Sequence, residues 1–186
     1  MKQAVPEYRI IRSDRKSVAL QVRPEGLIVR APKRMSDRQI KAFVESRSDW
    51  IAAHTAKMQA AQQAAVQPLT DAEIRALAAQ ARREIPPRVA YYASRLGVTY
   101  GRITIRCQRS RWGSCSAKGN LNFNCLLMLT PPEVRDSVIV HELCHRREMN
   151  HSAAFYRLVC QLMPDYPARN RWLKENGTAL MLRLSR

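Results

Sequence analysis

The residues most suited to chemistry lie in one histidine-rich stretch, residues 141–151 (HELCHRREMNH). Three of the four histidines in this 186-residue chain fall there, namely His141, His145 and His151, and Glu142 follows the first of them. Residues four positions apart on an α-helix share one face, one turn apart. Two imidazoles at that spacing can bind one metal ion, and the adjacent glutamate can act on a metal-bound water. The stretch therefore predicts a metal centre.

A catalytic metal needs a third protein ligand and an open position for water. His151 is the candidate, because it follows His145 beyond a helix end expected at residues 149–150. Asn150 tolerates the left-handed conformation that would reverse the chain there. Three imidazoles favour Zn²⁺, one ion per chain, although Ni²⁺ or Co²⁺ could occupy the same ligands in vitro. Glu142 is then the candidate general base.

The net charge is +17, and part of it is concentrated. Between Ile85 and Pro132 there is no acidic residue, whereas seven are basic, including Arg109 and Arg111. This charge favours an anionic partner and leaves an association with nucleic acid open. The aromatic-rich strand signature of an RNA-binding sheet is missing, so charge alone does not identify a nucleic-acid-binding module.

Composition also indicates the cellular compartment of the protein. The five cysteines are odd in number and include no CxxC pair, so we expect reduced thiols. The N-terminus lacks the apolar run of a signal peptide, and the run CLLML (125–129) is far too short to cross a bilayer. We expect a cytoplasmic protein without a membrane interaction. The oligomeric state does not follow from the sequence.

The elements expected before the histidines begin with short strands at residues 8–11, 17–22 and 27–31. A capping box at Ser36 then opens a helix over 37–57, and a second box at Thr70 opens another that ends at Gly97. Pro86 and Pro87 are expected to break or kink that helix. The chain divides into an N-terminal part, 1–69, and a metal-binding part, 70–186, which could also pack as one unit.

Two strands, 102–107 and 120–127, are expected next, joined by RSRWGSCSAKG, where Gly113 permits a sharp turn. Thr130 opens the histidine-bearing helix with a third capping box, T-P-P-E. A further helix ends at Pro164, and a last short helix spans about 167–177.

Beyond these patterns, the sequence resembles the YgjP-like metal-dependent hydrolases, zincin-type proteins related to the WLM and SprT groups. The resemblance lies in WGSCSAKGNLNFN, TPPEVRDSVIVHELCH, MNHSAAFYRLVCQLMPDY and WLK, and most specifically in residues 109–174. It implies an α+β fold. In that fold a zincin-like catalytic domain packs a small antiparallel sheet on the HExxH helix, after an N-terminal β-rich segment and helices. It also implies zinc at the three histidines and Glu142 as the catalytic carboxylate.

In zincins the strand before the active-site helix commonly aligns an extended substrate. Residues 120–127 are placed for that role, which makes Asn122 and Asn124 candidate substrate-binding residues. Arg109 and Arg111, beside WGSC, are candidates for binding an anionic part of the substrate.

Three functions remain open on this basis. The leading one is a zinc-dependent hydrolase of the peptidase type. The second keeps the metal but hydrolyses nucleotides or other phosphate-containing small molecules. The third is a basic, nucleic-acid-associated protein with a non-catalytic metal site, against which the intact Glu142 argues.

Overall fold

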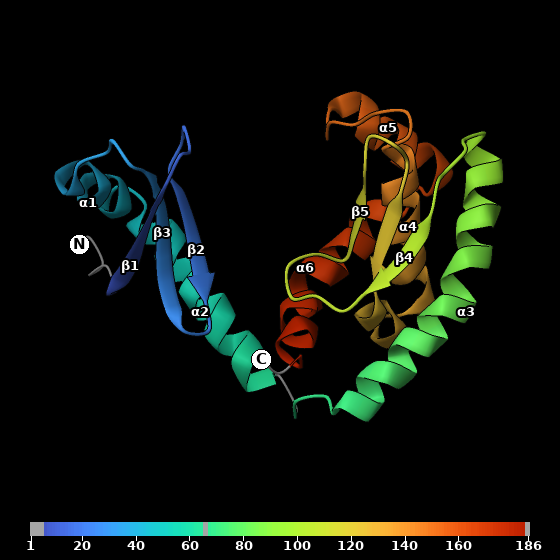
Figure 1. Ribbon diagram of the computed structural model, residues 1–186, viewed down its shortest axis with the longest axis horizontal. Helices are drawn as coiled ribbons and strands as arrows, with labels where there is room; N and C mark the ends of the chain where they lie inside the picture. Colours follow the sequence, from blue (N-terminus) through green and yellow to red (C-terminus); the bar gives the residue numbers. More distant parts are fainter. Residues whose placement is uncertain (1–5, 65–66, 185–186) are drawn as a thin grey trace. The chain divides into compact units, whose positions relative to one another are not determined.

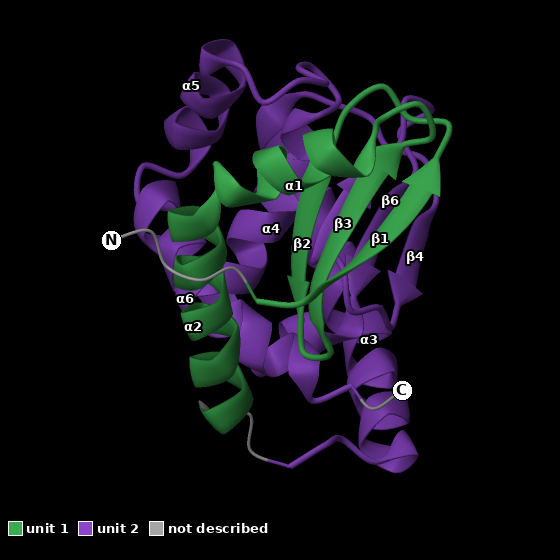
Figure 2. Cartoon of the chain, turned by 90° about the vertical axis from the view of Figure 1, so that its left-hand side faces the viewer, with its two compact units in different colours: residues 1–64 green, residues 65–186 purple. Residues whose placement is uncertain are grey.

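The computed structural model describes residues 6–64 and 67–184. The chain divides into two compact units, residues 1–64 and residues 65–186 (Figure 2). The histidine-rich stretch belongs to the second unit, whose elements therefore position the candidate site. Within the two described ranges, none of the helices combines the length and apolar character needed to cross a membrane.

The first unit packs a small sheet on helices (Figure 1). The strand order is β1-β3-β2, with β1 parallel and β2 antiparallel to β3. Alternate residues of β3, Leu27, Val29 and Ala31, are buried against the helices, as a strand with one covered face requires. The elements are β1 (Tyr8–Ser13), β2 (Ala19–Arg23), β3 (Gly26–Pro32), α1 (Asp37–Glu45) and α2 (Ser48–Ala64).

The capping box at Ser36 is confirmed, but the single helix predicted over 37–57 is wrong. The chain forms α1 and α2 in succession instead. The hydroxyl of Ser46 donates to the carbonyl of Phe43 at 2.7 Å. Such local bonding competes with the regular helical pattern and explains why α1 ends there.

The second unit is built around α4, the helix that carries His141. This helix contacts α3, α5, α6 and β5, and its interior residues are among the most buried in the chain. In order, the elements are α3 (Asp71–Leu96), β4 (Ile103–Arg106), β5 (Gly113–Cys115), β6 (Leu121–Asn124), the 3₁₀ helix η1 (Cys125–Leu129), α4 (Pro132–Cys144), α5 (Ala153–Leu162) and α6 (Tyr166–Leu182).

The α+β class is confirmed, whereas the sheet beside α4 is mixed rather than antiparallel. Its order is β4-β6-β5, with β4 parallel and β5 antiparallel to β6. The loop after β4 leads into β5 on the far side of β6, so the two strands predicted as neighbours run in the same direction. Leu121 and Phe123 of β6 are fully buried in the main core.

Of the break or kink predicted at Pro86 and Pro87, the break is wrong, because α3 is one continuous helix from Asp71 to Leu96. A proline inside a helix costs about 3 kcal/mol. Burial on both sides of the prolines offsets that cost, because Ala81, Ile85 and Val89 are completely buried in the main core. Tertiary packing has overridden the local preference of the sequence.

The helix ends agree with the sequence at α3 and differ at α4. The capping box at Thr70 and the left-handed Gly97 are both present. The box predicted at Thr130 is not formed, because its hydroxyl donates to the carbonyl of Leu127 at 2.8 Å and closes η1 instead. Pro131 occupies the position before α4 and provides no side-chain cap.

The last helix is longer than the predicted 167–177, since α6 continues to Leu182. Gly177 is therefore inside the helix and does not end it. A Cβ atom at Gly177 would lie 3.0 Å from the indole ring of Trp112. The glycine permits α6 to pack closely on that ring.

Candidate metal centre

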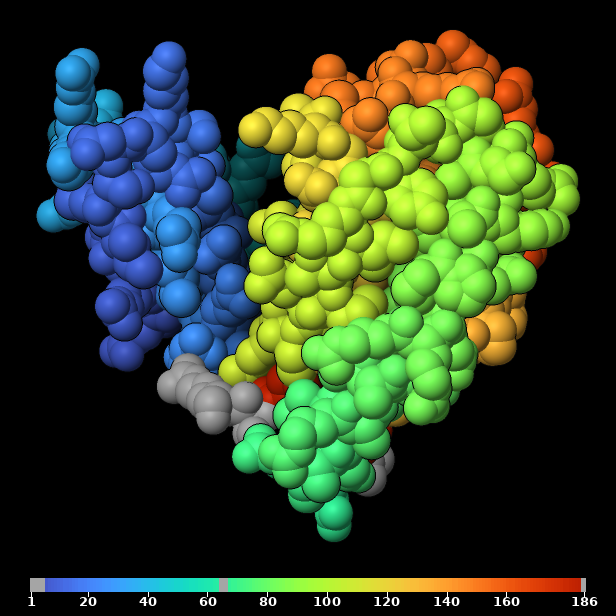
Figure 3. All heavy atoms as spheres, turned by 45° about the vertical axis from the view of Figure 1, so that its right-hand side comes forward, coloured from blue at the N-terminus to red at the C-terminus, as the bar shows by residue number. Residues whose placement is uncertain are grey.

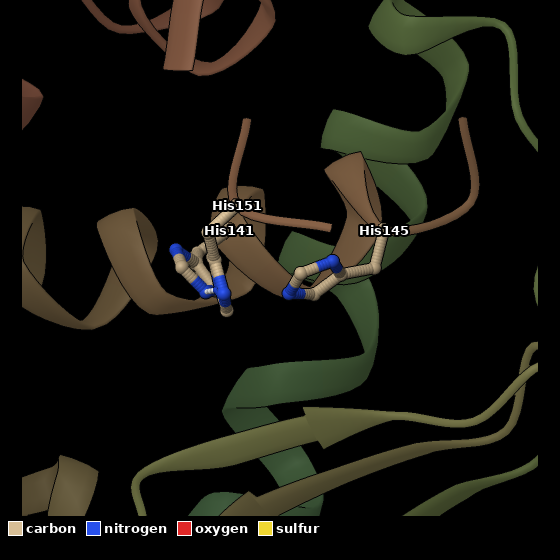
Figure 4. Close-up of side chains that lie close together, drawn as sticks. All are labelled: His141, His145 and His151. Carbon is tan, nitrogen blue, oxygen red and sulfur yellow. Dashed lines mark hydrogen bonds between the residues drawn. The ribbon is translucent and has the colours of Figure 1, made fainter. Parts of the chain in front are cut away.

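His141, His145 and His151 point toward a common centre (Figure 4). Their ligand atoms all lie within 4.8 Å of one another. The Nε2 atoms of His141 and His151 are 2.9 Å apart. The structure thus brings together the three histidines that the sequence predicted as ligands.

The backbone that carries them differs in detail from the prediction. Helix α4 ends at Cys144, earlier than residues 149–150, and the chain tightens there, since the amides of Arg146 and Arg147 donate to carbonyls only three residues back. His145 still has helical φ and ψ, so it stays one turn from His141. The expected left-handed Asn150 is wrong: among the described residues, only glycines have positive φ.

Hydrogen bonds at the far side of two rings fix which nitrogen is free. The Nδ1 atom of His145 lies 3.0 Å from the carbonyl oxygen of Glu148. A carbonyl only accepts, so Nδ1 carries the proton and Nε2 keeps its lone pair. His141 Nδ1 lies 2.8 Å from the hydroxyl of Tyr166, an arrangement that allows the same tautomer. Such outer contacts orient metal-binding histidines in general.

The surroundings also keep these rings neutral. Burial, with a smaller contribution from the nearby His145 and His151, lowers the pKa of His141 to about 4. Burial likewise lowers the pKa of His145. The ring of Phe155 stacks on His145 with 4.6 Å between ring centroids, which shields it from water. Neutral imidazole is the form that binds a metal ion.

The donor set fits a zinc ion. Neutral imidazoles suit borderline metals, and zinc is commonly held by three protein ligands with a fourth position left to water. Among the described residues, the group of potential ligands that converges here consists of the three histidines alone. A catalytic type of centre, with an open position, is the arrangement that this set can provide.

Glu142 lies beside the histidines and is 6% exposed. Burial raises the pKa of its carboxyl to about 8, and the positive charge of Arg111 partly opposes that rise. The carboxyl has no hydrogen-bond donor among the described residues, in contrast to the paired Asp136 on the same helix. A buried carboxyl without a partner is often a functional group.

Gly113 makes room for that carboxyl. A Cβ atom at Gly113 would lie 2.6 Å from Oε1 of Glu142 and 2.7 Å from its Cγ. The predicted sharp turn at Gly113 is wrong, since the residue lies within β5 and does not have positive φ. The glycine is required by the close approach of β5 to α4, a long-range contact that the local sequence does not reveal.

A half-open pocket of about 160 Å³ adjoins His141 and Glu142. We call it the side pocket. It is formed between α4, α6 and the start of β5. The remaining lining residues are Trp112, Gly113, Ser137, Val138, Tyr166, Asn170 and Leu173.

The arginines proposed for substrate binding differ in their surroundings. Arg109 and Arg111 are exposed, in the yellow-green segment at the surface of the second unit (Figure 3). Arg111 is near enough to Glu142 to influence its pKa. Arg146 is already engaged, because its guanidinium donates to the carbonyls of Thr99 at 2.9 Å and Ala117 at 3.3 Å.

The two asparagines of β6 have structural contacts. Asn124 is fully buried, and its amide donates to the carbonyls of Gln108 at 2.6 Å and Arg111 at 3.0 Å. This placement makes Asn124 a positioning residue for the arginine-bearing loop, not a residue in contact with substrate. Asn122 is partly exposed and donates to the hydroxyl of Ser114 at 3.2 Å. Because β6 is the central strand, both of its edges are already paired.

Several site residues were missed by the sequence analysis. Tyr166 and Gly113 touch His141 and Glu142 from distant parts of the chain, and no local pattern marks them. Asn170 did leave a signal. It is the one polar member of a stripe at helical spacing on α6. The helix was predicted to begin at about residue 167; a helix predicted from Tyr166 would have revealed this stripe.

In comparison with known proteins, one family model matches most of the chain. Residues 16–77 and 67–176 match the YgjP-like metallopeptidase domain. The chain is also 33% identical over 58 residues to the UTP pyrophosphatase of Escherichia coli. That match covers 31% of this chain and 35% of the length of the relative.

Two solved structures share part of the architecture. The metallopeptidase zymogen abylysin of Pyrococcus abyssi is 19% identical, with a TM-score of 0.44, over 49% of this chain and 93% of that chain. Jannalysin of Methanocaldococcus jannaschii, also a metallopeptidase zymogen, is 18% identical, with a TM-score of 0.45, over 50% and 97%.

The histidine geometry predicts one transition-metal ion per chain. Replacing His141, His145 or His151 by alanine removes one of three ligands and should weaken zinc affinity by at least about tenfold. His54, the fourth histidine, stacks on Trp50 in the other unit and provides the control. Zinc titration against a competing chelator measures the effect. Equal affinity in the His54 and His151 variants would exclude His151 as a ligand.

The buried Glu142 predicts a pH-dependent stability of the metal-free protein. Its folded pKa of about 8 exceeds the ordinary 4.5, so the folded protein keeps a proton that the unfolded chain has released between these values. Stability should fall as pH rises through this window. At pH 9 the free energy of unfolding of Glu142→Gln should exceed that of the wild type by about 2–4 kcal/mol, whereas at pH 4 the two values should be equal. Urea unfolding measures these free energies. If they changed with pH in the same way in wild type and variant, the prediction would be contradicted.

Proposed function

The chain belongs to the YgjP-like metallopeptidase family, and from that membership we propose that it is a zinc-dependent hydrolase that cleaves peptide bonds. His141, His145 and His151 would hold the metal, and Glu142 would act as general base. The observation that carries the proposal is the convergence of three imidazoles, whose ligand atoms lie within 4.8 Å of one another, beside the buried carboxyl of Glu142.

Zinc in this position supplies a Lewis acid for the scissile carbonyl and lowers the pKa of a water molecule. Glu142 takes the proton of the attacking water and transfers it to the leaving amine. A divalent cation held by the histidines would favour the ionised form of this carboxyl, which is the form that accepts the proton. The Glu148 carbonyl holds His145 in the tautomer that metal binding requires, and the contact of Tyr166 with His141 allows the same tautomer there.

Strand β5 is the element best placed to align an extended peptide. It is an edge strand of its sheet, and it lies against Glu142 through Gly113. Trp112 and Ser116 pair with β6 through their backbones, and this pattern alternates along an antiparallel strand. The backbone groups of Gly113 and Cys115 therefore face the free edge. An extended substrate could pair with them as an added strand.

A second candidate function is hydrolysis of nucleotides. Two observations favour it: the partial match to a protein named UTP pyrophosphatase, and the exposed Arg109 and Arg111, the second of which is near Glu142. Arginine binds phosphate oxygens through paired donors. The metal and Glu142 would keep their roles, with the attack directed at phosphorus.

The role of the carboxylate predicts the behaviour of Glu142→Gln. Glutamine keeps the shape of the side chain but cannot accept the proton, so turnover should fall by at least about a hundredfold while zinc content is retained. Turnover of a peptide library, with metal content measured on the same samples, tests this. Glu148→Gln is the control, because the contact of Glu148 with His145 uses its backbone carbonyl. Unchanged turnover in Glu142→Gln would disprove the assignment of the base.

The two substrate classes predict opposite responses to salt. If the substrate is a nucleotide, Arg109→Ala and Arg111→Ala should each raise the Michaelis constant, and added salt should raise it in the wild type. A neutral peptide bound through backbone pairing should show little of either effect. Arg171→Ala, an exposed arginine of α6, is the control. Michaelis constants that respond neither to salt nor to these two substitutions would exclude the nucleotide.

A further inference from the structure

The side pocket has the size of a single substrate group. Its volume is about 160 Å³, and it opens beside His141 and Glu142. An apolar cavity of about 150 Å³ is known to hold one benzene molecule. The pocket can therefore receive one six-membered ring or one side chain of medium size next to the bond that is cleaved, but not an indole together with its linker.

Its lining excludes charged groups. Val138 and Leu173 supply apolar walls, with Trp112 beside them. Among the described residues, no lysine or arginine lines the pocket, so a carboxylate or phosphate inside it would be desolvated without a cationic side chain in the wall. A lysine side chain would gain only Glu142, the residue whose carboxyl must remain available as base.

Most of the polar groups in the lining are already engaged. The hydroxyl of Ser137 donates to the carbonyl of Val134 at 2.7 Å. The hydroxyl of Tyr166 contacts Nδ1 of His141 at 2.8 Å. Asn170 differs from both, because in the described part of the chain its side-chain amide has no hydrogen-bond partner.

The lack of a hydrogen-bond partner is unusual for an amide at the position of Asn170. This residue stands on the inward face of α6, between Tyr166 at i−4 and Leu173 at i+3, with the buried Gly177 one turn beyond. An apolar residue would fill that place at no hydrogen-bonding cost. An amide that loses water when the pocket is occupied needs a hydrogen-bond partner on the occupant, because an unsatisfied amide would weaken binding.

We propose that the side pocket selects an uncharged group carrying a carboxamide or imide, and that Asn170 is its specificity-determining residue. An amide offers a donor and an acceptor side by side, which a carboxamide or imide can match with two hydrogen bonds. The side chain of a glutamine in a peptide and the edge of a uracil ring share this chemistry. The proposal rests on the metal centre of the proposed function, which would hold the reacting bond beside the pocket.

Amino-acid hydroxamates test the proposal without requiring turnover. A hydroxamate chelates the metal and presents its side chain to the adjoining pocket. Calorimetry on zinc-loaded protein would compare the alanine, leucine, glutamine and glutamate derivatives. We expect the glutamine derivative to bind about tenfold tighter than the leucine derivative, which corresponds to the contribution of one or two net hydrogen bonds. The glutamate derivative should bind most weakly.

Variants of α6 connect that preference to Asn170. Asn170→Leu should reverse the order of the glutamine and leucine derivatives. Asn176→Leu should leave it unchanged, since Asn176 is exposed on the same helix and donates to the Trp172 carbonyl. Leu173→Trp should fill the pocket and remove the differences between side chains, while the alanine derivative continues to bind. Zinc content verifies that each variant is folded.

The outcomes separate this proposal from the one on which it rests. If the alanine derivative does not bind, the open metal centre itself is wrong. If it binds but the side chains make no difference, or if Asn170→Leu keeps the wild-type order, the pocket proposal is overturned and the metal centre survives. Uridine that displaces the glutamine derivative identifies a base as the natural occupant. A glutamine preference without that displacement identifies a peptide side chain.

Discussion

The burial of α4 is the constraint on which the second unit depends. This helix is covered by α3, α5, α6 and β5, so almost every side chain it carries must be accommodated in the interior. Apolar residues meet that requirement directly. Two carboxylates on the same helix, Asp136 and Glu142, do not, and the way each is accommodated separates structure from chemistry. Asp136 receives hydrogen bonds from Arg88 and Tyr92 of α3 and thereby fastens the two helices together. Glu142 has no hydrogen-bond donor among the described residues; Gly113 leaves room for its carboxyl, and Arg111 is near enough to influence its pKa.

Burial without a hydrogen-bond donor disfavours the ionised carboxylate, and Glu142 meets this penalty directly beside the cluster of histidines. The penalty appears as a carboxyl pKa of about 8 instead of 4.5. His141 is shifted in the opposite direction by the same cause, so burial holds both groups neutral near pH 7. A divalent cation among the imidazoles would favour the ionised carboxylate, because opposite charges attract strongly where water is excluded. The packing of one helix thus prepares ligands and base together.

Several short-range features of this molecule could be predicted from the sequence, although the cap at Thr130 and the end of α1 could not, and the long-range features were missed. The spacing of His141 and His145 determines their common face wherever the helix lies, and the capping boxes at Ser36 and Thr70 involve residues only three apart. The unbroken course of α3 through its prolines depends on a core contributed by other elements. The same holds for the parallel pairing of β4 with β6 and for the space at Gly113. Each of these reflects a contact between segments that the sequence does not place side by side.

Helix α6 connects the two halves of the candidate site. Tyr166, in its first turn, contacts His141, and Asn170, one turn later, lines the side pocket. Two turns further, Gly177 lies against the ring of Trp112, which lines the same pocket. The close contact at Gly177 therefore sets the distance of α6 from the ring, and with it the width of the pocket and the position of the tyrosine. A larger residue at Gly177 would push α6 outward and disturb both. Orientation of the metal ligand and recognition of the substrate are thus two consequences of how one helix packs.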